Sequence, residues 1–275
     1  MRPPRHPWLL TLLAGVTTAV FLLPVYWMAK TGLTEPDRIL TPSPQWVPTP
    51  LTGENFDTAL GYEGLTRALL NSLVIAGGVV ALTLLLGLPL GYALARVRMR
   101  GSGTMVFALL VAQLPPAIVL AAPLFILERR AGLDDTYLGL IAADTTLTLP
   151  FTVIVLRPVL RAFPPELEEA ALVDGCGLPG VLLRVVLPLT VPGVVAAAGL
   201  SFLLAWGEFL FGLTLAGDSD VQPVTVLLNA FIGQHGTAWG ALMATATLIS
   251  LPVVCVFALF QRFIVGGLTA GGVRG

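Results

Sequence analysis

Residues 71–95 of the chain read NSLVIAGGVVALTLLLGLPLGYALA, and no charged side chain interrupts this stretch. A helix needs about 20 mostly apolar residues to cross the roughly 30 Å hydrocarbon core of a bilayer. The apolar run is continuous, whereas a strand of a membrane barrel alternates apolar and polar residues. The stretch therefore predicts a transmembrane α-helix.

The composition of the whole chain agrees with this prediction. Of the 275 residues, 56% are hydrophobic and only 11% are charged, and the mean hydropathy is +0.87. A soluble globular chain carries about 25% charged residues, so this chain has too little polar surface to fold in water. The net charge of −1 gives no basic field for nucleic acid. Cys176 and Cys255 lie in very different sequence contexts, which makes a structural disulfide improbable.

Five further stretches resemble the first in length and composition. We therefore expect an all-α integral membrane protein with six transmembrane helices, in one domain over residues 1–275. The expected spans are residues 8–29, 71–95, 104–127, 137–156, 186–215 and 239–263. Residues 8–29 follow Arg2, Arg5 and His6, but no cleavage site of the A-x-A type follows them, so we interpret them as a retained signal anchor.

The distribution of basic residues predicts the orientation. With the N-terminus in the cytoplasm, ten of the fifteen Arg and Lys residues lie on the inner side and five on the outer side. This is the bias that the positive-inside rule describes. We therefore expect both termini to be cytoplasmic and residues 157–185 to form the longest inner loop.

The residues required for several kinds of chemistry are missing from the chain. Lys30 is the sole lysine and follows no glycine-rich loop, so the chain has no P-loop for ATP. His6 and His235 are the sole histidines, which excludes an H-E-x-x-H zinc site. We expect no catalytic residue, no metal site and no cofactor site in this chain, and hence a protein that is not an enzyme by itself.

The inner loop contains a short helix that its own sequence limits at both ends. Pro165 suits the first turn of a helix, and Gly175 suits the left-handed residue that ends one. Leu167, Ala170, Ala171 and Asp174 are spaced at i, i+3, i+4 and i+7 and share one face. Either this face contacts another protein, or the helix is a solvated connector between two transmembrane helices.

The motif Glu169-Ala170-Ala171, followed after three residues by Gly175 and after nine more by Val185-Val186-Leu187-Pro188, resembles the EAA loop of ABC importer permeases. The resemblance places that loop at residues 164–188, between the fourth and fifth helices. It implies that a separate ATPase docks on the loop. The implied docking residues are Glu169, Ala170, Ala171, Asp174 and Gly175.

The resemblance to this family also implies the partners and the location. The resemblance implies that such a chain forms a heterodimer with a second permease subunit and works with two ATP-binding subunits and an external solute-binding protein. ATP and Mg bind to the partner ATPase. The location implied is the bacterial or archaeal cell (inner) membrane, which the chain crosses several times.

Weaker likenesses favour carbohydrate uptake. Residues 70–73, 91–96, 132–136 and the glycine-rich tail 261–275 resemble the maltose-permease type of subunit. The implied function is import of a sugar or an oligosaccharide. Trp206-Gly207-Glu208-Phe209 departs from the Trp-Asn-Glu-Phe that the family often has, and this weakens the inference about the particular sugar. The alternatives are another polar solute, such as a polyamine or a glycerol-phosphate-like compound, and, more distantly, an ion-coupled secondary transporter.

Four residues are candidates for the translocation path. Glu208 and Asp144 are the two acidic residues inside the expected spans, where a carboxylate usually faces a cavity or a partner. Trp206 can stack on a sugar ring, and Gln113 precedes Pro115 and Pro116, which predict a kink. The alternative for each residue is a structural role in helix packing.

Overall fold

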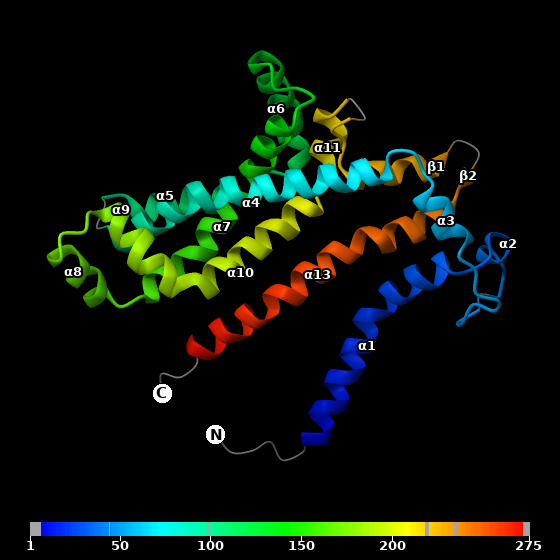
Figure 1. Cartoon of the computed structure of the whole chain (residues 1–275), viewed down its shortest axis with the longest axis horizontal. Coiled ribbons are helices and arrows are strands. Elements are labelled where there is room, and N and C mark those ends of the chain that lie inside the picture. The colour runs from blue at the N-terminus through cyan, green and yellow to red at the C-terminus, as the bar shows by residue number, and fades with distance from the viewer. Residues whose placement is uncertain (1–6, 44, 98–99, 218–219, 234–235, 272–275) are drawn as a thin grey trace. The chain divides into compact units, whose positions relative to one another are not determined.

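A computed structural model describes residues 7–43, 45–97, 100–217, 220–233 and 236–271 (Figure 1). The two ends of the chain, which carry Arg2, Arg5, His6 and Arg274, lie outside the described residues, as does His235. The elements in chain order are α1 (Pro7–Gly32), α2 (Pro36–Ile39), α3 (Glu54–Leu60), α4 (Leu65–Arg96), α5 (Ser102–Val111), α6 (Ala117–Ala131), α7 (Tyr137–Ala162), α8 (Pro165–Val173), α9 (Leu178–Val181), η1 (Leu182–Val186), α10 (Leu187–Trp206), α11 (Leu210–Leu215), α12 (Val224–Leu227), η2 (Leu228–Phe231), β1 (Ile232–Gly233), β2 (Gly236–Thr237) and α13 (Trp239–Gly271).

Five helical segments of the described chain are long and apolar enough to cross a membrane. They are Trp8–Gly32, Leu65–Arg96, Tyr137–Ala162, Leu178–Trp206 and Trp239–Gln261. The only strands among the described residues, β1 and β2, pair over two residues each. The expected all-α membrane fold is confirmed, whereas the number of crossings and the side on which the termini lie stay predictions.

The expected span 104–127 is not one helix. It is divided between α5, which has 10 residues, and α6, which has 15 residues. The two helices are separated at Pro115 and Pro116, and Pro116 is the N-cap of α6 with φ −59° and ψ 142°. Proline has no N–H to donate and holds the residue before it in an extended conformation. Pro115 and Pro116 therefore separate two helices, whereas the sequence predicted only a kink within one helix.

The expected span 186–215 is also interrupted. α10 ends at Trp206, and α11 begins at Leu210 after Gly207, Glu208 and Phe209. Thr225 Oγ1 donates to the Glu208 carbonyl at 2.7 Å, so the break is stabilised by a residue beyond α11. The chain between Trp206 and Leu210 thereby brings Glu208 to the start of a new helix.

The described chain divides into two compact units. The first comprises Met1–Thr66 and Leu227–Leu251, and the second comprises Arg67–Val226 and Pro252–Gly275. In the first unit, Asn55 Nδ2 donates to the carbonyl oxygens of Gly32 at 3.1 Å and Thr34 at 2.7 Å. These bonds satisfy carbonyl groups at the end of α1 that have no partner within the helix.

The second unit is built on the close packing of α7 and α10 (Figure 1). Thr152 Oγ1 and Ser201 Oγ lie 2.6 Å apart in its buried interior. Hydrogen bonds of this kind, together with small residues at the contact, hold membrane helices together. At Gly193 on α10, an added Cβ would lie 3.1 Å from Cβ of Val159 on α7 and closer still to its methyl groups.

We predict that Gly193→Leu destabilises this unit. The side chain of Val159 is β-branched and cannot turn away from the atoms that the leucine adds. Overpacking of a helix contact costs about 1–3 kcal/mol, so the purified protein should unfold at a lower temperature in detergent. Gly77→Leu is the matched control, since an added Cβ there has no atom within 4 Å. Equal melting temperatures for the two variants would contradict the assigned contact.

Candidate functional site

The loop helix α8 has the ends that its sequence predicts. It begins at Pro165 and ends at Val173, and Gly175 has a left-handed φ of +87°. The Gly175 N–H donates to the Leu172 carbonyl at 3.1 Å, and the Cys176 N–H donates to the Ala171 carbonyl at 3.0 Å. This pair of bonds is the Schellman arrangement, in which a left-handed glycine closes the last turn. The helix is therefore a fixed short rod.

The expected docking residues divide into two groups by exposure. Glu169, Ala170, Asp174 and Gly175 are exposed. Ala171 is only 8% exposed and belongs to the apolar core that also contains Leu160 and Val181. The side chain of Ala171 thus packs inside this chain, and the surface that a partner can reach is formed by the other four residues.

Glu168 holds α8 against the end of α4. Its carboxylate lies 2.9 Å from Nε of Arg96 and accepts a hydrogen bond of 3.0 Å from the Tyr92 hydroxyl. Arg96 also donates to the Phe163 carbonyl, just before α8. The side chains of Arg96 and Glu168 are 15% and 11% exposed, so little water screens the pair. We call this group of Tyr92, Arg96 and Glu168 the anchor.

Sequence reasoning missed the anchor. None of its three residues is among the site residues predicted from the sequence. Tyr92 and Arg96 are four residues apart on α4, so they share one helix face. This spacing was the available signal, but it does not identify a partner more than seventy residues later in the chain.

Beyond α8, residues 174–177 form a short turn, and from α9 onward the chain is helical without interruption to the end of α10. α9 runs directly into the π-helical turn η1 at Leu182–Val186, and α10 starts at Leu187. Pro188 and Pro192 have no N–H to donate to the preceding turn, which explains a local departure from α-helical bonding. The last part of the loop, α9 and η1, is therefore one continuous helical segment with α10.

Three of the four expected path residues line one cavity of the second unit. This cavity has a volume of about 290 Å³ and is lined by Gln113, Ala117, Asp144, Leu147, Thr148, Phe151, Leu204, Ala205 and Glu208. The Gln113 side chain donates to the Leu147 carbonyl at 3.0 Å. Asp144 is 4% exposed, and its Oδ1 has no hydrogen-bond partner within the described residues. We call this space the carboxylate cavity.

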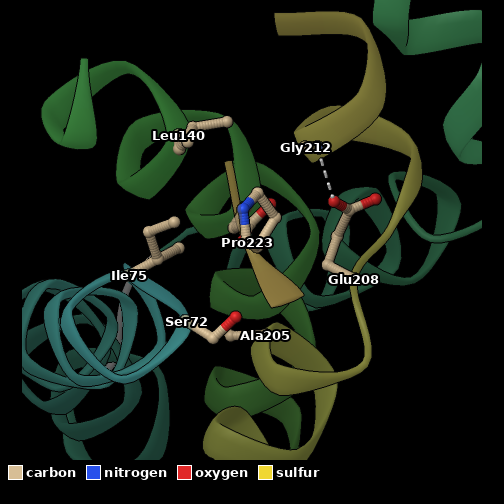
Figure 2. A pocket seen from close by; sticks show the side chains of 8 residues that line it. Ser72, Ile75, Leu140, Ala205, Glu208, Gly212 and Pro223 are labelled. Carbon is tan, nitrogen blue, oxygen red and sulfur yellow. Dashed lines mark hydrogen bonds between the residues drawn. The ribbon is translucent and has the colours of Figure 1, made fainter. Parts of the chain in front are cut away.

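Glu208 has a structural role as well. Its carboxylate accepts hydrogen bonds from the backbone N–H of Phe211 at 2.9 Å and of Gly212 at 3.1 Å, in the first turn of α11. Figure 2 shows the bond to Gly212 beside a second, much smaller pocket of about 10 Å³ that Glu208 also lines with Ser72 and Pro223. A carboxylate at this position satisfies N–H groups that have no partner in the helix. Glu208 therefore holds the shape of the cavity wall.

Trp206 is not among the residues that line the carboxylate cavity. Its indole is 4% exposed and stacks on Phe202, with ring centroids 5.5 Å apart. This burial fits the alternative weighed for Trp206, which was packing between helices. Within the described residues, no group of three or more His, Cys, Asp or Glu side chains is arranged to hold a metal ion.

The fold and these sites define a membrane subunit with an internal polar cavity and an anchored loop helix. Residues 86–269 match the model of the family "Binding-protein-dependent transport system inner membrane component". The chain belongs to this family. It is thus a transport subunit and an integral, multi-pass protein of the cell membrane.

Named relatives cover nearly the whole chain. Diacetylchitobiose uptake system permease protein DasC of Streptomyces coelicolor is 34% identical over 265 residues, which are 95% of this chain and 96% of that protein. Trehalose transport system permease protein SugB of Mycobacterium tuberculosis is 33% identical over 256 residues, which are 92% of this chain and 93% of that protein.

A solved structure supports the fold. A chain of a bacterial ABC transporter involved in the import of the acidic polysaccharide alginate superposes with a TM-score of 0.78 at 18% sequence identity. The match covers 95% of this chain and 99% of that one. At this identity the likeness concerns the fold and not the solute.

We predict that Glu168→Gln loosens α8, because it leaves Arg96 without its buried counter-charge. Loss of one partner of a buried ion pair costs about 3–5 kcal/mol, so thermal stability should fall and protease should cut within residues 164–178 more readily. Glu166→Gln, on the exposed side of the same helix, should change neither.

A double-mutant cycle tests whether the pair itself is responsible. The cycle compares Arg96→Met, Glu168→Leu and the double variant, which removes both charges and should be more stable than Glu168→Leu alone. Additive losses would show that the two side chains act independently, contrary to the anchor.

Proposed function

We propose that this chain is the permease subunit of an ATP-driven importer, that it forms half of a translocation path for a sugar or oligosaccharide, and that it receives mechanical work through α8. The observation that carries the proposal is the geometry of α8. The helix is tied internally by Glu168 and presents Glu169, Ala170, Asp174 and Gly175 outward. A helix with one anchored face and one free face suits the transfer of motion between proteins.

The proposal includes the partners that such a subunit requires. They are a second permease subunit of different sequence, two ATP-binding subunits that hold ATP and Mg, and an external solute-binding protein. The absence of a P-loop from the sequence supports assignment of ATP hydrolysis to other chains. The exposed residues of α8 are then the contact for an ATP-binding subunit.

The proposed mechanism is alternating access driven from α8. A displacement of α8 is transmitted to α4 through the anchor. It reaches α10 through the packing of Ala171 against Val181 and Val186 and through η1, which is continuous with α10. Packed helices respond to such a displacement by moving as units. The carboxylate cavity lies between segments that include α7 and α10, so their relative movement changes its access.

The solute assignment rests on the relatives and on the chemistry of the cavity. The named relatives take up diacetylchitobiose and trehalose, both of which are sugars. The cavity offers Asp144, Thr148 and Gln113 as polar groups beside Phe151, which suits hydroxyl groups next to the apolar face of a sugar ring. Another polar solute is the second candidate. Membership in a binding-protein-dependent family disfavours the ion-coupled alternative.

We predict that Glu169→Lys uncouples ATP hydrolysis from uptake while the protein still inserts in the membrane. Reversing an interface charge costs about 2 kcal/mol or more, so solute-stimulated ATPase activity of the assembly should fall at least about tenfold. Glu166→Lys changes the same charge at another exposed position of α8 and serves as the control. Normal stimulation in the Glu169 variant would refute the docking assignment.

We predict that Asp144→Asn lowers solute uptake without loosening α8, because the carboxylate faces the cavity and is remote in sequence from the anchor. A hydrogen bond to a charged group contributes about 1.5–3 kcal/mol, so uptake at low solute concentration should fall about tenfold or more. Asp134→Asn, on the surface, is the control. Unchanged uptake by the Asp144 variant would remove this carboxylate from the path.

A further inference from the structure

A second polar pocket lies at the end of α1, in the first compact unit, and the proposed transport function does not use it. It has a volume of about 150 Å³ and is lined by Lys30, Thr34, Arg38, Thr41, Ser43 and Gln45. Two of these side chains are cationic, and none carries a carboxylate. The chemistry of the pocket is that of a site for an anion.

Lys30 is an unusual residue at this position. It is the sole lysine of the chain and is only 7% exposed. Its ammonium lies 4.6 Å from the ring centroid of Trp27, and it forms no ion pair in the part of the chain that the structure describes. A buried cation is costly unless an anion or hydrogen-bond acceptors compensate it.

Arg38 pairs with one carboxylate, and the pocket still carries a net positive charge because Lys30 has no such partner among the described residues. Its Nε lies 2.7 Å from a carboxylate oxygen of Glu35, and its Nη1 donates to the Thr49 carbonyl at 2.8 Å. Glu35 thus offsets one of the two cations. Gln45 accepts a hydrogen bond from the Thr49 N–H through Oε1, which leaves the NH₂ end of its amide as a donor.

The surroundings of the pocket indicate where the anion comes from. Trp8–Gly32 is a candidate membrane span whose most apolar window has no buried residue, and Lys30 lies in its last turn. Beside it, Trp27 and Trp46 pack edge to face with centroids 5.7 Å apart, and the Tyr26 hydroxyl donates to the Trp46 carbonyl. Tryptophan and tyrosine gather at the depth of lipid headgroups, and lysine and arginine side chains form charge-assisted hydrogen bonds to phosphate oxygens.

We propose that the pocket of Lys30 and Arg38 binds the phosphate of an anionic phospholipid headgroup. The ammonium of Lys30 and the pocket-facing donors of Arg38, Ser43 and Gln45 contact the phosphate oxygens. Trp27 and Trp46 lie at the level of the glycerol backbone. The lipid thereby ties the end of α1 to the segment that follows it.

The test is native mass spectrometry of the intact assembly, purified with its partner subunits, stripped of lipid and titrated with phosphatidylglycerol. One tightly bound phosphatidylglycerol is expected for the wild type, with about fivefold weaker binding for Lys30→Gln. Lys30→Arg should retain the binding. Arg130→Gln removes one exposed charge elsewhere and should match the wild type.

Further arms of the experiment distinguish the source of the phosphate. Phosphatidylcholine, which has no net charge, should bind with no dependence on Lys30. Inorganic phosphate that binds through Lys30 while phosphatidylglycerol does not would overturn the lipid assignment. Equal phosphatidylglycerol binding by wild type, Lys30→Gln and Arg130→Gln would overturn the site altogether. If Lys30→Gln does not assemble, Arg38→Gln removes the other cation of the pocket, and phosphatidylglycerol binding by that variant equal to the wild type would count against the proposal.

Discussion

The ion pair of Glu168 and Arg96 is the interaction on which the position of α8 and of the loop around it depends. The carboxylate of Glu168 belongs to a side chain that is only 11% exposed, so its negative charge is stable only with a compensating partner close by. Arg96 and Tyr92 supply that compensation from the last turns of α4, and they fix both the distance and the rotation of α8. Without the pair, only the packing of Ala171 in the apolar core and the two ends of the helix would connect α8 to the membrane helices.

The lipid environment explains why the polar groups of the second unit are arranged in pairs. Thr83 lies 3.1 Å from Thr148, and Thr152 lies 2.6 Å from Ser201, each pair between different helices. In a bilayer these hydroxyl groups have no water to bind, so each one bonds within the protein. Asp144 departs from this pattern because its Oδ1 faces a cavity. Glu128 Oε1 also has no hydrogen-bond partner within the described residues, but Glu128 does not line the carboxylate cavity. The combination of an unpaired oxygen and a place in the cavity wall is what distinguishes Asp144.

The sequence predicted the parts of the fold that depend on local chemistry. Apolar runs located the long helices, and Pro165 and Gly175 located the ends of α8, because length and capping are properties of short segments. It did not predict the separation of α5 from α6 or the break after Trp206. Whether two prolines bend a helix or end it depends on whether neighbouring segments satisfy the freed backbone groups.

The candidate site shows the same division. Gln113, Asp144 and Glu208 were each identified as a polar residue in an apolar stretch, and the structure brings all three to one cavity. The burial of Trp206 against Phe202 and of Ala171 in the core depends on tertiary packing, which spacing along the chain does not reveal. The anchor was missed for the same reason, since its members come from distant parts of the sequence.

The adjacent residues Glu168 and Glu169 have opposite surroundings, one inside the protein and one at its surface. One of them can therefore be substituted without a change in the role of the other. If α8 is the contact for an ATP-binding subunit, as proposed, substitutions on its outward side can adapt the chain to a different such subunit and leave the anchor unaltered. One ATP-binding subunit could then serve several permeases that differ in the solute they carry.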